Sequence, residues 1–275
     1  MKPTLMWRAA TLGMMLASCA GKHDTGEQPM DEGTIRKDLE VIAAHRVFFG
    51  HQSVGVDIME GVRELNAATG STVRFAGATS DSLPAGPWCA DAIVGRNGDP
   101  ASKCAAFAAT VDRLSRDSLE LAVLKFCYVD IKPGRDIDSM FREYERTVMG
   151  LKQSHPALII VHATVPLTER APWWKRAIRK VLGREETTDE SNAGRARFNE
   201  MLTGRFGGEP LFDIARLEST YPDGTRCGFD AGGRKVYSLI GAYTRDGGHF
   251  NDAGRRLAAA AFVRTLAGAL GEKAR

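Results

Sequence analysis

The sequence predicts an α/β protein, a three-layer α/β/α sandwich around a central parallel sheet of about five strands. Short apolar runs alternate along the chain with longer segments whose apolar residues recur every three or four positions. These are the patterns of buried strands and of amphipathic helices. Repeated alternation of the two is typical of a parallel sheet with helices on both faces. The composition, 43% hydrophobic and 26% charged, is that of a globular protein with a sizeable core.

The strands are predicted where apolar residues cluster, at residues 47–49, 72–75, 119–126, 157–161 and 210–214. Residues 77–100 are rich in Gly, Pro, Ser and Asp, which predicts a loop. Helices are expected to begin at cap residues, namely Thr34, Asp99 (followed by Pro100), Ser191 and the Asn251-Asp252 pair. The last helix is expected to end at Gly271.

The N-terminus does not look like part of this domain. Lys2 and Arg8 precede a short apolar run that ends in Leu16-Ala17-Ser18-Cys19, the pattern of a secretory signal. The last four residues resemble the lipobox of bacterial lipoproteins, which implies cleavage before Cys19 and lipid attached to its thiol. The alternative is an ordinary signal peptide with an incidental cysteine.

We therefore expect a lipoprotein signal peptide at 1–18, a flexible tether at 19–33 and a single domain at 34–275. The lipid on Cys19 would anchor the exported chain to a membrane, facing the periplasm. Ala20, rather than an aspartate, follows the cysteine, and in such proteins this implies the outer membrane.

Charge and cysteine spacing exclude several functions. Removing residues 1–18 deletes Lys2 and Arg8, so the formal charge falls from +3 to +1, which argues against a nucleic-acid partner. In an exported chain, Cys89 and Cys104 are the most plausible disulfide pair, and Cys127 is expected as a buried thiol. The absence of a Cys-x-x-Cys motif and the scattered histidines make a metal site improbable.

Three residues far apart in the sequence have the chemistry of a hydrolytic triad. Asp246 and His249 lie three residues apart in a Gly-rich loop before the last helix, so the carboxylate can meet the imidazole. Ser53 lies where the first strand turns into a helix. A serine hydroxyl needs a base within reach, and the base needs an acid that orients it. Ser53 could instead be no more than a helix cap.

This order, Ser53 after the first strand and Asp246-x-x-His249 before the last helix, resembles the SGNH, or GDSL-type, hydrolases. Those are α/β esterases and lipases of flavodoxin-like topology. Residues 246–254 are similar to the final block of the family, and residues 49–55 stand where its first block should be. The resemblance covers most of residues 45–270. It implies Ser53 as nucleophile, His249 as base, Asp246 as orienting acid and no cofactor.

The sequence departs from the family at the first block and at the third. His51-Gln52-Ser53 replaces the usual Gly-Asp-Ser, and the strand ending near Phe126 lacks the Asn that supplies an oxyanion donor. Gly95 or Gly98 is the best candidate for the glycine donor, and Asn97 could replace the missing side chain. Losing one such donor costs about 10²–10³ in rate.

The sequence thus predicts a cell-envelope serine esterase that removes acyl groups from a carbohydrate or a small ester. Two alternatives stay open, an O-acyltransferase with the same triad and an inactive glycan-binding lipoprotein. His51 and His162 are more simply explained as structural histidines. The basic, amphipathic segment 172–182 is either a lid, glycan-stacking or membrane-surface element, or a short helix with its apolar face packed on the domain.

Overall fold

The computed structural model describes residues 31–79, 83–183 and 187–273. The predicted signal peptide, Cys19 and nearly all of the predicted tether lie outside these residues, so the lipoprotein assignment stays a prediction. No helix within the described ranges is long and apolar enough to cross a membrane.

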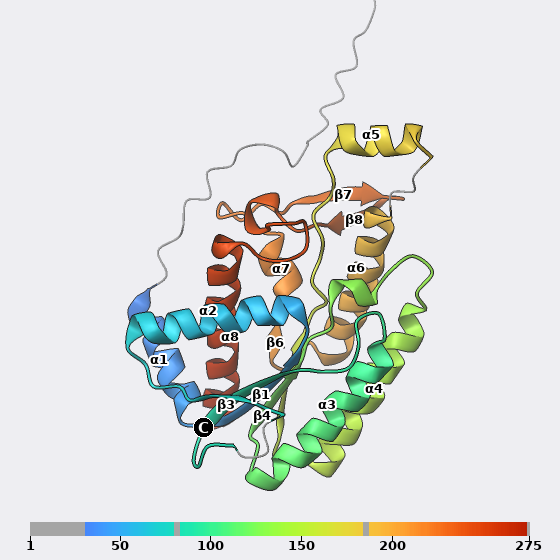
Figure 1. Cartoon of the computed structure of the whole chain (residues 1–275). Coiled ribbons are helices and arrows are strands. Elements are labelled where there is room, and N and C mark those ends of the chain that lie inside the picture. Colours follow the sequence, from blue (N-terminus) through green and yellow to red (C-terminus); the bar gives the residue numbers. More distant parts are fainter. Residues whose placement is uncertain (1–30, 80–82, 184–186, 274–275) are drawn as a thin grey trace, which may run out of the picture.

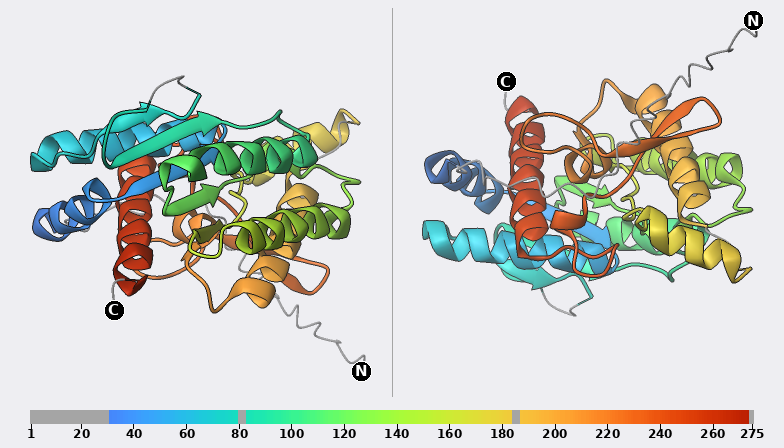
Figure 2. Two further views of the ribbon diagram at one scale, coloured as in Figure 1. Left: turned by 90° about the horizontal axis from the view of Figure 1, so that it is seen from below. Right: turned by 90° about the horizontal axis from the view of Figure 1, so that it is seen from above.

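The centre of the molecule is a six-stranded sheet with the order β2-β3-β1-β4-β5-β6, in which all paired strands are parallel (Figures 1 and 2). The strands are β1 (Arg46–His51), β2 (Phe75–Gly77), β3 (Trp88–Ile93), β4 (Leu121–Leu124), β5 (Ile159–Ala163) and β6 (Leu211–Phe212). Apart from the short edge strand β2, the order is that of a flavodoxin-like sheet. The predicted fold class is confirmed.

Two parts of the strand prediction were wrong. The second strand is Phe75–Gly77 rather than 72–75. The predicted loop 77–100 contains β3, which pairs with β1 along its whole length. The β3 sequence, Trp-Cys-Ala-Asp-Ala-Ile, carries small residues and an aspartate, so no apolar run marks it. Its strand conformation is stabilised by pairing with β2 on one side and with β1, which is distant in sequence, on the other.

Helices cover both faces of the sheet, as Figure 1 shows. One layer contains α1 (Glu32–Ala43), α2 (Ser53–Thr69), α7 (Ile214–Glu218) and α8 (Asp252–Lys273), and the other contains α3 (Pro100–Leu114), α4 (Ile137–Ser154) and α6 (Thr188–Phe206). The helix α5 (Trp173–Val181) lies outside both layers, and a small antiparallel ribbon, β7 (Gly228–Ala231) and β8 (Arg234–Tyr237), lies nearby.

The predicted helix ends are partly correct. Asp99 caps α3 as predicted, since its carboxylate accepts a hydrogen bond from the Ser102 N–H. The first helix is capped by Asp31 rather than Thr34, and α6 begins at Thr188, before the predicted cap Ser191. The helix α8 continues past Gly271 to Lys273.

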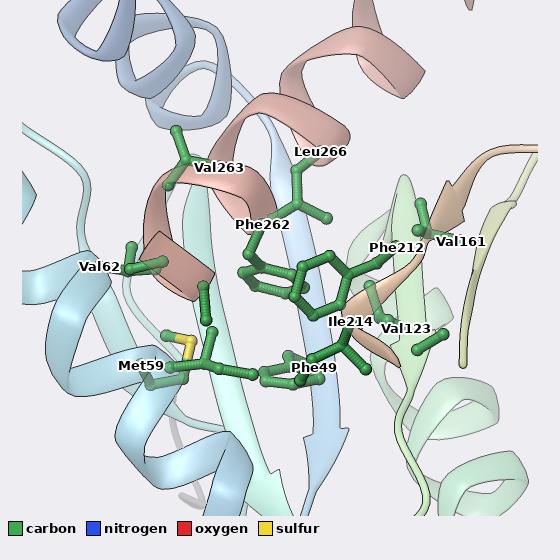
Figure 3. Packing of buried hydrophobic residues seen from close by; sticks show 14 of the residues in the cluster. Phe49, Met59, Val62, Val123, Val161, Phe212, Ile214, Phe262, Val263 and Leu266 are labelled. Carbon is green, nitrogen blue, oxygen red and sulfur yellow. The ribbon is translucent and has the colours of Figure 1, made fainter. Parts of the chain in front are cut away.

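Successive residues of the inner strands alternate between two cores. Phe49 on β1 packs with α2 and α8 on one face, where its ring lies 4.6 Å from that of Phe262 (Figure 3). Phe48, one residue earlier, faces the opposite layer and stacks on Phe107 of α3. Both faces of the sheet are therefore buried, which explains why the sequences of these strands are continuous apolar runs.

The same alternation shows why the predicted disulfide is wrong. Cys89 on β3 belongs to the core beneath α1 and α8, whereas Cys104 on α3 belongs to the core on the other face. All four described cysteines are buried thiols, including Cys127 as predicted. Two thiols on opposite faces of one sheet cannot reach the geometry of a disulfide.

Candidate active site

Ser53 stands at the carboxyl edge of the sheet, at the first residue of α2 and directly after β1. Gln52, the preceding residue, is extended and buried, and its side chain does not cap the helix. Its amide instead donates to the carbonyls of Val94 (2.7 Å) and Gly95 (3.1 Å). These bonds fix the turn that carries the serine against the turn that follows β3.

The structure brings Ser53, His249 and Asp246 together, although Ser53 and His249 are separated by almost two hundred residues. Ser53 Oγ lies 2.9 Å from His249 Nε2, and His249 Nδ1 lies 2.6 Å from Asp246 Oδ2. An ionised carboxylate only accepts hydrogen bonds, so Nδ1 carries the ring proton and Nε2 is left to accept from the serine hydroxyl. This is the tautomer that a general base requires.

Hydrogen bonds hold Asp246 in its charged form. Burial alone would raise its pKa, but the backbone N–H and ring of His249, together with the Gly248 N–H, outweigh this effect and lower the pKa to about 2. The carboxylate therefore stays ionised at pH values well above 2.

The loop that carries Asp246 and His249 is anchored to α2. The buried carboxylate of Asp57, one helical turn after Ser53, accepts from both terminal nitrogens of Arg245 and from the Phe250 N–H. Thr244 Oγ1 donates to the His249 carbonyl and accepts from the Gly247 N–H. The same helix thus positions the serine and clamps the loop that bears its base.

Two backbone N–H groups are candidate oxyanion donors. The N–H of Ser53, at the positive end of the α2 dipole, and the N–H of Gly95 make no hydrogen bond to any other described residue. The N–H of Gly98, the other predicted glycine donor, is occupied by Asp130 at 2.8 Å. Asn97 is exposed, and its amide oxygen accepts from Lys103. The geometry therefore favours Gly95 over Gly98.

Tyr128 was not predicted as a site residue. It follows β4, near where the family's Asn would stand, and its ring meets His249 edge-on at 5.7 Å between centroids. A Cβ on Gly248 would lie 2.7 Å from this ring, so only glycine fits there. Arg195 fixes the backbone at Tyr128 by donating to the Tyr128 carbonyl. The feature of the sequence that could have identified Tyr128 is a tyrosine placed shortly after the central strand β4.

The two other histidines near the sheet have structural roles, as predicted. The buried ring of His51 faces the Asp91 carboxylate at 3.0 Å, and Arg63 pairs with the same carboxylate, which joins β1, β3 and α2. His162 contacts the Tyr144 hydroxyl and the Glu209 carboxylate and stacks on Phe206. Among the described residues no cluster of His, Cys, Asp and Glu could hold a metal ion.

A three-layer α/β/α fold with a serine after β1 and an Asp-x-x-His pair before the last helix defines the class: the chain has the SGNH-type hydrolase fold. No protein-family model and no curated protein matches the sequence.

Among solved structures, the chain is similar to a lipase/acylhydrolase from Enterococcus faecalis, with 14% identity, a TM-score of 0.47 and coverage of 82% of this chain and 96% of that chain. It is also similar to a carbohydrate esterase family 3 protein from Talaromyces cellulolyticus, with 14% identity, a TM-score of 0.48 and coverage of 83% and 99%. At this level of similarity, function has to be inferred from the side-chain geometry.

Replacing Gly95 with alanine is expected to lower kcat/KM by about 10²–10³, the usual cost of one oxyanion donor. Gly95 has a φ of +60°, and a Cβ there would lie 2.5 Å from the backbone nitrogen of Lys103, so the turn has to move. Gly98→Ala is the matched control, because its φ is +80° but no atom lies within 4 Å of the added carbon. Steady-state kinetics showing equal losses in both variants would contradict the role of Gly95.

Proposed function

We propose that this protein is a serine ester hydrolase that works through an acyl-enzyme. The continuous hydrogen-bond chain from Ser53 through His249 to Asp246 supports the proposal most strongly. All three side chains are oriented for one task, and the His249 side chain is partly exposed, at 23%, so a substrate can reach it. An intact chain of this kind favours catalysis over a purely binding role.

In the first half-reaction, Ser53 Oγ attacks the acyl carbonyl carbon while His249 Nε2 takes the hydroxyl proton. Asp246 stabilises the imidazolium that forms. The negative charge on the carbonyl oxygen is stabilised by the N–H groups of Ser53 and Gly95. When the tetrahedral intermediate collapses, Nε2 returns the proton to the leaving alcohol, and the acyl group stays on Ser53.

In the second half-reaction, His249 takes a proton from water as the water oxygen attacks the acyl carbon. Collapse releases the carboxylic acid and returns the proton to Ser53. All of these steps need only groups of the chain and water, so the mechanism requires no cofactor.

For the substrate, we propose an O-acyl group on a carbohydrate of the cell envelope, or a small ester. The support comes from the predicted export signal and the predicted lipid on Cys19, which would hold the domain at an envelope membrane. A sugar hydroxyl in place of water in the second half-reaction would make the same residues an O-acyltransferase.

A fluorophosphonate probe tests the proposal, because it reacts with an activated serine nucleophile. We expect the wild-type chain to be labelled and Ser53→Ala to remain unlabelled. Ser102→Ala, on α3 and engaged with Asp99, is the control that should label as the wild type does. A wild-type chain that fails to label and releases no acid from an acetyl ester would refute the proposal.

A further inference from the structure

The helix α5 has its apolar side chains in solvent. Seven large hydrophobic side chains are exposed among the described residues, and five of them lie within residues 173–182. Their exposed fractions are 67% for Trp173, 48% for Trp174, 52% for Ile178, 85% for Val181 and 63% for Leu182. Exposed apolar groups that gather in one place mark an interaction site, whereas scattered ones do not.

The orientation of α5 is the reverse of that in an ordinary surface helix. Trp174, Ile178 and Val181 follow the i, i+4, i+7 spacing of one helical face, and that face is the exposed one. Arg176 points back to the protein and pairs with Asp189 at 3.1 Å. Of the two alternatives for this segment, the one in which the apolar face packs on the domain is therefore excluded.

The α5 segment is also strongly basic. Residues 170–183 contain five Lys and Arg residues and no Asp or Glu. Lys175 is exposed beside Trp174, with its ammonium 5.3 Å from the indole ring. Tryptophan, aliphatic side chains and lysine on one short helix are the components of a helix that lies in the headgroup region of a bilayer.

The position of α5 links this surface to the candidate active site. The segment leading into α5 crosses the loop that carries Asp246 and His249 (here called the catalytic loop). The Glu169 N–H donates to the Gly247 carbonyl of this loop at 2.8 Å. In Figure 1, α5 is the outermost helix at this end of the molecule, clear of the two helical layers. A flat surface that contacts α5 would therefore lie at the same end of the domain as the catalytic loop.

We propose that the exposed face of α5 docks on an anionic lipid surface. The apolar side chains enter the headgroup region while the exposed Lys175 meets the lipid phosphates. A second copy of the chain is a poorer fit, since stable protein interfaces use about 20–30 residues a side. Five exposed side chains on one short helix and the residue after it are too few for this, and two equally basic helices would repel each other.

Vesicle binding tests the proposal with the full-length chain carrying Cys19→Ala, so that no attached lipid contributes. The N-terminal apolar run is present in every variant and adds the same background. We expect binding to vesicles of phosphatidylcholine and phosphatidylglycerol to exceed binding to phosphatidylcholine alone and to weaken with added salt. Ile178→Glu should weaken binding roughly tenfold or more, because a carboxylate replaces a membrane-facing side chain.

Met149→Glu is the matched control. Met149 is an exposed apolar residue on α4, so the substitution makes the same change of charge away from α5, and binding should not change. Ser53→Ala should also bind as the wild type does, which separates this proposal from that of ester hydrolysis. The proposal is overturned if Ile178→Glu and Met149→Glu bind equally well. It is also overturned if sedimentation shows that Ile178→Glu abolishes a dimer and leaves vesicle binding intact.

Discussion

Replacing Asp246 with asparagine is expected to lower kcat by about 10⁴-fold while leaving the fold intact. The N–H groups of Gly248 and His249 both donate to Asp246 Oδ1, so the amide oxygen of asparagine must occupy that position. Its NH₂ group then faces His249 Nδ1 and forces the ring proton onto Nε2. In that tautomer His249 cannot accept the proton of Ser53.

Steady-state hydrolysis of an acetyl ester measures this effect, and unfolding in urea checks that stability is retained. Asp138→Asn is the control, since Asp138 forms a surface pair with Arg197 on α4 and α6. That variant should keep wild-type kcat. An Asp246→Asn enzyme with more than a tenth of wild-type kcat would contradict the assigned role. Because the pKa of Asp246 is about 2, activity lost between pH 6 and pH 4 must come from protonation of another group.

Replacing Lys103 with methionine is expected to destabilise the protein by about 3–5 kcal/mol. Lys103 and Asp130 form an ion pair in which neither side chain is exposed. Asp130 also accepts from the N–H groups of Gly98 and Cys127, so one carboxylate ties together the turns after β3 and β4. Removing only the lysine leaves this charge buried without its counterion.

Urea unfolding of four variants, namely Lys103→Met, Asp130→Asn, the double variant and Arg234→Met, tests this explanation. In Lys103→Met/Asp130→Asn no uncompensated charge remains, so it should be more stable than the sum of the single losses predicts, by about 0.5–3 kcal/mol. Arg234→Met breaks the exposed pair with Glu200 and should cost no more than about 1 kcal/mol. Equal losses for Lys103→Met and Arg234→Met would show that burial of the pair is unimportant.

The parts of the fold that were predicted correctly have strong local signals. The strands β1, β4 and β5 are buried on both faces, so each appears as a run of apolar residues. The pair Asp99-Pro100 marks the start of α3 because the cap and the first turn involve only neighbouring residues. By contrast, β3 has no apolar run, and it was missed because it is stabilised along its whole length by β1, which is distant in sequence.

The candidate site likewise has residues that the sequence indicated and residues that only tertiary contacts could identify. The sequence indicated Ser53, Asp246 and His249 from residue type, glycine spacing and position between elements. It left Gly95 and Gly98 as alternatives for the glycine oxyanion donor, offered Asn97 as a replacement for the missing side-chain donor, and paired Cys89 with Cys104. Tertiary contacts decide both questions. Asp130 accepts the hydrogen bond of the Gly98 N–H, which leaves Gly95 as the glycine donor. The sheet lies between Cys89 and Cys104, so these two cysteines cannot pair.

By itself, the sequence determined the alternation of strands and helices, and hence a parallel sheet whose carboxyl edge would gather the triad. These features follow from periodicity and capping, which are local. Only the tertiary structure decided which backbone N–H groups remain available and that α5 presents Trp174, Ile178 and Val181 to solvent. Amphipathic spacing is the same whether a helix turns its apolar face inward or outward, because that choice depends on contacts with the rest of the domain.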